Sequence, residues 1–438
     1  MHKMQIGFVL ALFVLAVLVG VAAVGDESAV ASVTSDELGS VHVNSSSGDQ
    51  PVFLNGVDVV SEQQQQRAVV QAQAQQIAEL TSLAHVQAAG IEMLNRTVLA
   101  QAAQIAALQE QVCALNPPGT NFITGIGLNF RQWQGGVLAP NGLVYGVPHG
   151  ATSVLILDPV TETFDKTTIA GLPSDPYKWA GGVLAPNNNI IYCIPHSADS
   201  VLKIDSATNT ADWTTITGVG SQLIKFSGGV LANNGRIYGI PSNAAFVLII
   251  DPATDTIDTT TLSGVSGQQE KWSGGVVVPD GRIFCIPDRL GIVLIIDPAT
   301  NTIDTTSLGG FGSSISKWLG GVLANNGLIY GIPGNSNSVL IIDPETMTAD
   351  TSTISGLGNG GDSWLGGVLA NNGKIYGIPF NEEAVLIIDP ETNTADTTTL
   401  ANVGSGQSKY ADGVLANNGK IFGFPSNVDN ALVISPGC

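Results

Sequence analysis

Lysine stands immediately before an aromatic residue at five places along the chain, although the protein has only 16 Lys and Arg in total. The five residues are Lys178, Lys225, Lys271, Lys317 and Lys409. A ring of cations beside aromatic side chains would bind a small anion or a glycan, through charge and through contact with the ring faces. The alternative is that each lysine pairs with a neighbouring Asp or stays solvated while each aromatic residue packs between repeats.

The aromatic residues of this series recur at spacings of 46, 47, 46, 46, 46 and 46 residues. They are Trp133, Trp179, Phe226, Trp272, Trp318, Trp364 and Tyr410. The tryptophans join the lysines as candidate ligand-binding residues. At two places the lysine is replaced, by Gln132 beside Arg131 and by Ser363.

His149 and His196 occupy equivalent positions in successive repeats and are the candidates for a catalytic or metal-binding role. Two histidines without a third ligand are a poor zinc set. Pairs such as Asp251 and Asp258 offer carboxylates, but no spacing resembles a Ca²⁺ loop. The sequence has no Gly-x-Ser-x-Gly, His-Glu-x-x-His or strand–helix Gly-x-Gly-x-x-Gly motif, so we expect no metal and no cofactor, and a binding protein rather than an enzyme.

These residues must be positioned by a repeat of four short strands. Each aromatic residue is followed by Gly-Gly or Asp-Gly and an apolar run, and then by a turn such as Asn233-Asn234-Gly235. A strand of the type Ile375–Pro379 and a variable loop come next, and a strand ending in Asp-Pro and a Thr-rich strand complete the repeat. Four strands at this period predict the blades of an all-β, closed seven-bladed β-propeller over residues 117–438.

Closure of the ring is also predicted. The seventh repeat stops at Cys438 after its third strand, 431–434, and its missing fourth strand is expected at 121–127, which matches 216–220 of another repeat. A blade completed from both ends of the domain removes the open edges of a linear stack.

The repeats resemble those of the kelch and YVTN-type propeller families, in Ile-Tyr-x-Ile-Pro followed by Val-Leu-Ile-Ile-Asp-Pro-x-Thr-x-Thr. The resemblance covers residues 121–438 and concerns architecture only, because Gly-Gly falls before the first strand rather than after the strand that carries Tyr. These families include adhesion and scaffold proteins as well as lyases and oxidases, so the resemblance does not imply one function.

Two of the four cysteines flank the closure point, and we predict a disulfide between Cys113 and Cys438 in an oxidising compartment. The alternative is a bond between the Cys113 residues of two chains. Cys193 and Cys285 lie in non-adjacent repeats and are expected to be free and buried.

Residues 62–116 predict an α-helical coiled-coil stalk that makes a dimer or trimer. The a positions carry Val70, Ile77, Ala84, Ile91, Val98, Ile105 and Val112, and Leu alternates with Gln at d. The alternative is a single helix packed on its own propeller. Residues 26–61 are polar and aperiodic and are interpreted as a flexible spacer.

Residues 1–25 predict a secretory signal peptide, with an uncleaved membrane anchor as the alternative, since 6–24 are almost wholly apolar. The glycosylation sequons at Asn44 and Asn95 agree with an extracellular location. The net charge of −20 argues against nucleic acid and anionic membranes as partners. We therefore expect a secreted or surface-tethered oligomeric binding or adhesion module for a protein or glycan ligand. The alternatives are a propeller enzyme of lyase or lactonase type and a structural coat or matrix protein.

Overall fold

The computed structural model describes residues 32–35, 41–44, 53–54, 57–186, 188–358 and 360–437. Side chains are described from residue 61, apart from residues 106, 109, 110 and 112–114 near the end of the helix. The chain divides into two compact units, Met1–Ala107 and Leu108–Cys438, and each is described by itself.

Short strands precede the helix in the first unit. β1 (Ser32–Ser35) pairs antiparallel with β2 (Val41–Asn44), and β3 (Phe53–Leu54) pairs with β4 (Val57–Asp58). The described residues of the segment expected to be a spacer thus form two hairpin-like pairs. Their β-branched Val and Thr residues favour extended backbone.

Helix α2 runs over Val59–Leu115 and begins three residues before the predicted boundary. It ends just before Pro117 and Pro118, which cannot continue a helix. Every described side chain from 61 to 105 is exposed, including the a-position residues Ile77, Ile91 and Ile105. The described part of the chain contains no helix that is both long and apolar enough to cross a membrane.

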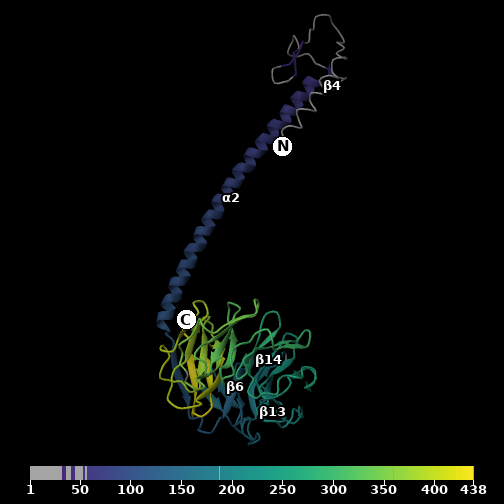
Figure 1. Cartoon of the computed structure of the whole chain (residues 1–438). Helices are drawn as coiled ribbons and strands as arrows, with labels where there is room; N and C mark the ends of the chain where they lie inside the picture. The colour runs from purple at the N-terminus through teal and green to yellow at the C-terminus, as the bar shows by residue number, and fades with distance from the viewer. Residues whose placement is uncertain are drawn as a thin grey trace. The chain divides into compact units, whose positions relative to one another are not determined.

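The second unit is a β-propeller of seven four-stranded sheets, as predicted (Figure 1). The first six blades follow chain order. Blade one is β6 (Trp133–Leu138), β7 (Val144–Pro148), β8 (Leu155–Asp158) and β9 (Thr163–Asp165); blade two is β10 (Trp179–Leu184), β11 (Ile190–Pro195), β12 (Leu202–Asp205) and β13 (Thr210–Asp212); blade three is β14 (Phe226–Leu231), β15 (Ile237–Pro241), β16 (Leu248–Asp251) and β17 (Thr256–Asp258). Blade four is β18 (Trp272–Val277), β19 (Ile283–Pro287), β20 (Leu294–Asp297) and β21 (Thr302–Asp304); blade five is β22 (Trp318–Leu323), β23 (Ile329–Pro333), β24 (Leu340–Asp343) and β25 (Thr348–Asp350); blade six is β26 (Trp364–Leu369), β27 (Ile375–Pro379), β28 (Leu386–Asp389) and β29 (Thr394–Asp396).

Blade seven closes the ring with strands from both ends of the unit. Its order is β30 (Tyr410–Leu415), β31 (Ile421–Pro425), β32 (Asn430–Ser435) and β5 (Gly119–Thr124). All six residues of β32 pair with β5, from Asn430 opposite Thr124 to Ser435 opposite Gly119. The predicted closure is confirmed, with the strand two residues earlier than 121–127, because Gly125 and Gly127 adopt positive φ and end it.

The innermost strands of the first six blades carry the Gly-Gly pair, and that of blade seven carries Asp412-Gly413. The ladder to the second strand shifts register at this pair, as between Trp179 and Gly182. Gly181 has a φ of 72° and faces the next blade so closely that an added Cβ would lie 3.0 Å from the Cα of Gly228. The inner strands converge on the axis here, so only glycine fits without displacing backbone.

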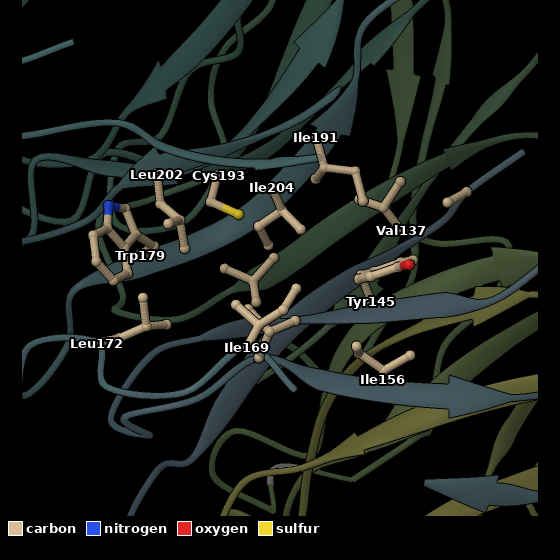
Figure 2. Packing of buried hydrophobic residues seen from close by; sticks show 13 residues of the cluster. Val137, Tyr145, Ile156, Ile169, Leu172, Trp179, Ile191, Cys193, Leu202 and Ile204 are labelled. Carbon is tan, nitrogen blue, oxygen red and sulfur yellow. The ribbon is translucent and has the colours of Figure 1, made fainter. Parts of the chain in front are cut away.

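Apolar side chains of neighbouring blades fill the space between sheets. Between blades one and two, Figure 2 shows Val137, Tyr145 and Ile156 facing Ile191, Cys193 and Leu202, with Trp179 at one end of the cluster. A four-stranded sheet cannot bury both faces alone, and each interface supplies the missing cover.

Turns of nearly constant sequence form the face opposite the variable loops. In six blades the Asp that ends the third strand accepts a backbone N–H two residues further on. Asp158 accepts that of Val160 at 2.8 Å, and this hydrogen bond lowers the pKa of its carboxyl. Tyr145 of blade one donates to Asn209 of blade two (2.6 Å) and ties neighbouring turns together. Asp in these turns therefore serves the blade.

Candidate functional site

The five lysines are buried, and their ammonium groups donate to backbone carbonyls. Lys271 Nζ lies 2.7, 2.9 and 3.1 Å from the carbonyl oxygens of Ser242, Ala244 and Gln268. Lys317 and Lys409 each reach three equivalent carbonyls, and Lys178 and Lys225 each reach two. Burial lowers the pKa of Lys178, Lys225, Lys271 and Lys317 to about 8. Each lysine thus joins the loop of the preceding blade to its own blade.

The tryptophans are buried in the same way. Their indole N–H groups donate to a carbonyl about 20 residues further along the chain, as Trp272 does to Ile292 at 2.8 Å. The other four bonds, of 2.7 to 2.9 Å, join Trp133 to Ser153, Trp179 to Ser200, Trp318 to Ser338 and Trp364 to Ala384.

This placement differs from the expectation that Lys178, Lys225, Lys271, Lys317 and Lys409 hold a ligand together with Trp133, Trp179, Trp272, Trp318 and Trp364. None of the ten side chains lines the cavity at the mouth of the propeller. The ammonium groups donate to carbonyls, and the indoles pack between blades. The physical reason is that a buried ammonium group must be hydrogen-bonded, and the loop carbonyls around each lysine offer two or three acceptors.

The cavity has a volume of about 440 Å³ and opens on the face of the variable loops. It is lined by three positions of the repeat: the residue before the lysine, the residue after the aromatic, and the residue after the second-strand proline. The first ring carries Arg131, Tyr177, Ile224, Glu270, Ser316 and Asp362; the second Gln134, Ser227, Ser273, Leu319, Leu365 and Ala411; the third His149, His196, Ser242, Asp288, Phe380 and Ser426. These positions differ from blade to blade, whereas the residues between them hardly do.

The first ring is held in the left-handed backbone region in every blade. Its φ values run from 47° at Arg131 to 59° at Tyr177, and include 58° at the β-branched Ile224. This conformation costs a non-glycine residue about 1–2 kcal/mol. Side chains from the loop of the preceding blade stabilise this conformation by accepting the backbone N–H. Asn427 accepts that of Arg131 (2.8 Å), and Asn243 accepts that of Glu270 (2.8 Å). Backbone held in this way at a cavity rim is typical of functional sites.

His149 and His196 come together in one wall of the cavity, with ring centroids 5.0 Å apart and Tyr177 within 5.2 Å of His149. His149 Nδ1 lies 2.9 Å from the carbonyl oxygen of Trp179, which only accepts, so Nδ1 carries the proton and Nε2 is the basic nitrogen. Burial lowers the pKa of His149 to about 3, and His196 and Arg131 add repulsion. Burial lowers the pKa of His196 to about 4. Both imidazoles are neutral at neutral pH.

Acidic residues form another wall. Burial, together with the negative charges of Glu270 and Asp362, raises the pKa of Asp288 to about 7. Asp288 accepts the backbone N–H of Ser316 at 2.6 Å, and Glu270 pairs with Arg289 at 3.2 Å. The sequence analysis did not single out Glu270 or Asp362.

Below the mouth, the axial channel narrows to about 80 Å³ among the inner-strand glycines. Asp412 stands where the other blades have glycine and shares their positive φ, at 67°. Burial raises the pKa of its carboxyl to about 6. Among the described residues, no cluster of His, Cys, Asp or Glu forms a candidate metal site.

The remaining predicted residues lie apart from this cavity. The side chain of Cys113 and the whole of Cys438 are outside the described residues, so their disulfide stays a prediction. Cys193 and Cys285 are free and buried, as expected. Asn95 is exposed on α2, and the side chain of Asn44 is outside the described part.

Comparison with protein-family models and with curated protein sequences finds no match. Solved structures of other propellers are similar. Virginiamycin B lyase from Staphylococcus aureus has a TM-score of 0.58 at 10% identity, over 72% of this chain and 98% of that chain. The WD40 β-propeller domain of Doa1 has a TM-score of 0.54 at 10% identity, over 72% and 97%. The extracellular domain of BT4673 from B. thetaiotaomicron has a TM-score of 0.53 at 12% identity, over 73% and 43%.

Because the sequence identities are only 10–12%, the comparisons show a shared fold and nothing more. They support the seven-bladed architecture, and kinship with kelch or YVTN repeats stays a prediction. The neighbours include both a lyase and extracellular domains, so the shared fold does not select one activity.

Proposed function

We propose that this protein is an extracellular binding module that takes a small polar ligand in the loop-face cavity. The observation that carries the proposal is the division of each repeat into constant and variable positions. Residues that build the blade recur, while the three positions that face the cavity carry Arg, His, Tyr, Ser, Asp, Glu or Phe according to blade. A volume of about 440 Å³ suits a small molecule or the end of a larger chain.

The apolar N-terminal segment and the extracellular neighbour support a location outside the cytosol. Oligomerisation through α2 would present several cavities at once and raise avidity for a repetitive target. A surface glycan or a protein terminus would fit that arrangement.

The test is a binding screen of the full chain against glycans, small anions and short peptides, with Arg131→Gln as the cavity variant. The matched control is Arg236→Gln, which removes an arginine from the opposite face, where it pairs with Asp251 at 3.2 Å. Binding that Arg131→Gln abolishes and Arg236→Gln leaves intact is the expected result. Equal effects of both variants, or no ligand at all, would favour the structural coat or matrix role instead.

A second candidate function is an enzyme of lyase or lactonase type, and one observation favours it. His149 Nε2 is an unprotonated nitrogen in the cavity wall, next to a second neutral imidazole and in the same cavity as Asp288. Such a group can accept a proton from a bound substrate. If a ligand from the screen is consumed, and His149→Gln stops its turnover while binding remains, the enzyme hypothesis replaces the binding module.

A further inference from the structure

We infer that the cavity recognises a dipolar ligand of the amino-acid or short-peptide class, whose carboxylate binds Arg131 and whose ammonium binds Asp362 beside Asp288. This inference rests on the proposed function and specifies its ligand. It follows from two opposite charges that line the same cavity without a protein partner.

The positive side is Arg131. Its guanidinium lies 5.3 Å from the ring centroid of Tyr177 and 5.6 Å from that of Phe130, beside two aromatic rings that meet edge-on with centroids 6.3 Å apart. Its Nε is buried and has no hydrogen-bond partner. A buried donor of a charged group without an acceptor is costly, and a ligand carboxylate would satisfy it with charge-assisted hydrogen bonds.

The negative side is Asp362. Its Oδ1 is buried and has no hydrogen-bond partner, whereas Glu270 already pairs with Arg289. Asp288 lies close enough to Asp362 and Glu270 for their charges to act on its carboxyl. Arg289 pairs with Glu270, and the charge of the buried Lys317 acts on Asp288, so among these three carboxyl groups Asp362 is the one left to bind the cation of a ligand.

The two walls belong to different parts of the ring. Arg131, Tyr177 and the histidines come from blades one and two, and Glu270, Asp288 and Asp362 come from blades four and six. In the closed ring only blade seven lies between Arg131 at blade one and Asp362 at blade six, and it contributes Ser426 to the lining between them. The hydroxyls of Ser227, Ser242, Ser273 and Ser316 line the remaining arc, from blade three to blade five, and can bond the amide groups of a peptide.

Other charge patterns fit less well. Arg131 is the one cationic side chain that lines the cavity among the described residues, since both imidazoles are neutral and the lysines face carbonyls. One cation facing an acidic wall matches a single carboxylate, and it disfavours ligands with several phosphate or sulfate groups.

The experiment measures binding of diglycine, triglycine and the ω-amino acids from glycine to 6-aminohexanoate to the full chain by calorimetry at pH 7, where their amines are mainly protonated. N-acetyl-triglycine and triglycinamide are the blocked probes. We expect the free forms to bind, and each blocked form to bind at least about tenfold more weakly, because each loses one charge-assisted contact. The length of the best ω-amino acid reports the span between the walls.

Two variants assign the ends. Arg131→Gln should remove the preference for the free carboxylate and keep that for the free amine, and Asp362→Asn should do the reverse. Asp362→Glu should restore the amine preference, and an unchanged unfolding midpoint verifies folding of each variant. The controls are Arg236→Gln and Asp251→Asn, an ion pair of the opposite face, which should change neither preference.

Blocked probes that bind as well as free ones would overturn the inference, as would variants that weaken all probes alike. If only neutral glycans bind, and Arg131→Gln abolishes their binding, the inference fails while the proposed function stands. If nothing in either panel binds in the cavity, both fail.

Discussion

Lys271 illustrates how a charged residue becomes part of a core. Its side chain is fully buried, and three carbonyls from two segments surround the ammonium group. Burial lowers its pKa to about 8, so the ammonium is still the main form at neutral pH. Lys317 and Lys409 also reach three carbonyls, and Lys178 and Lys225 reach two, which makes all five lysines links between blades.

Replacing Lys271 by Met should therefore destabilise the propeller without touching the cavity. The methionine fills a similar volume but removes three charge-assisted hydrogen bonds to buried carbonyls, so we expect the free energy of unfolding in urea to fall by about 2–4 kcal/mol. Lys374→Met is the control, since Lys374 is partly exposed and pairs with Asp389 at 3.4 Å. Lys374→Met should lower the free energy of unfolding by less than about 1 kcal/mol. Similar losses for both variants would show that Lys271 is not a structural link.

The buried histidines should make the propeller sensitive to acid. The pKa of His149 is about 3 in the folded protein, against an ordinary value of 6.5. Between these values the unfolded chain binds more protons, so stability falls as pH drops from about 6.5 towards 3. Asp288 acts in the opposite direction, since its pKa is raised to about 7 and the folded form holds the extra proton.

The difference between wild type and His149→Gln isolates the imidazole, and glutamine can still donate to the carbonyl of Trp179. The variant should lose less stability on acidification, by up to about 1.4 kcal/mol per pH unit. Urea unfolding from pH 7 to pH 4 measures this, with His85→Gln on the exposed surface of α2 as control. Parallel pH profiles for wild type and His149→Gln would contradict the burial of a neutral imidazole.

At the scale of elements, α2 is a helix with an unpartnered apolar surface. Ile77, Leu80, Ile91 and Leu94 are each more than 60% exposed, and they occupy a and d positions of the heptad register. A helix of 57 residues with such a seam gains stability chiefly by packing. Self-association through this surface remains a prediction.

Ile91→Asp should dissociate that assembly, because the variant places a charge in the apolar seam. We expect full-length wild type to sediment as a dimer or trimer and Ile91→Asp to shift towards monomer at the same concentration. Ala89→Asp is the control, since residue 89 is at an f position opposite the seam. If the wild-type protein is a monomer, the predicted self-association through α2 is wrong.

At the scale of the whole molecule, closure of the ring brings the two ends of the propeller unit into blade seven. The six-residue pairing of β5 with β32 holds them together through the backbone. A disulfide between Cys113 and Cys438 would add a covalent lock to this closure. On the chain-entropy model such a bond, closing a loop of over 300 residues, stabilises by about 5 kcal/mol.

Peptide mapping of the full chain under non-reducing conditions tests the pairing, and we expect one peptide that joins Cys113 to Cys438. Reduction of the native protein should then lower its stability by up to about 5 kcal/mol. Cys193 and Cys285 should remain unlabelled by thiol reagents until unfolding, because both are fully buried. A dimer on a non-reducing gel would favour the Cys113–Cys113 alternative.

By itself, the sequence determined the architecture. The architecture depends on local signals: the period of 46 residues, the Gly-Gly pairs and the turn residues. Because these signals recur in successive repeats, the numbers of strands and blades could be predicted. The split seventh repeat predicted closure for the same reason. The sequence also indicates which positions line the cavity, because positions that vary between repeats are free to bind a ligand. That rule points to the residues on either side of the lysine–aromatic pair, and it places the recurring lysine itself in the scaffold.

Tertiary structure alone decided which side chains face the cavity and which are buried beneath it. Lys271 and Glu270 are neighbours in the chain, but the left-handed backbone at Glu270 turns one side chain into the mouth and leaves the other among carbonyls. Arg131 and Asp362 are far apart in sequence and share one cavity only because the ring closes. The direction of a side chain and the meeting of distant repeats depend on backbone geometry and closure, which no local pattern encodes.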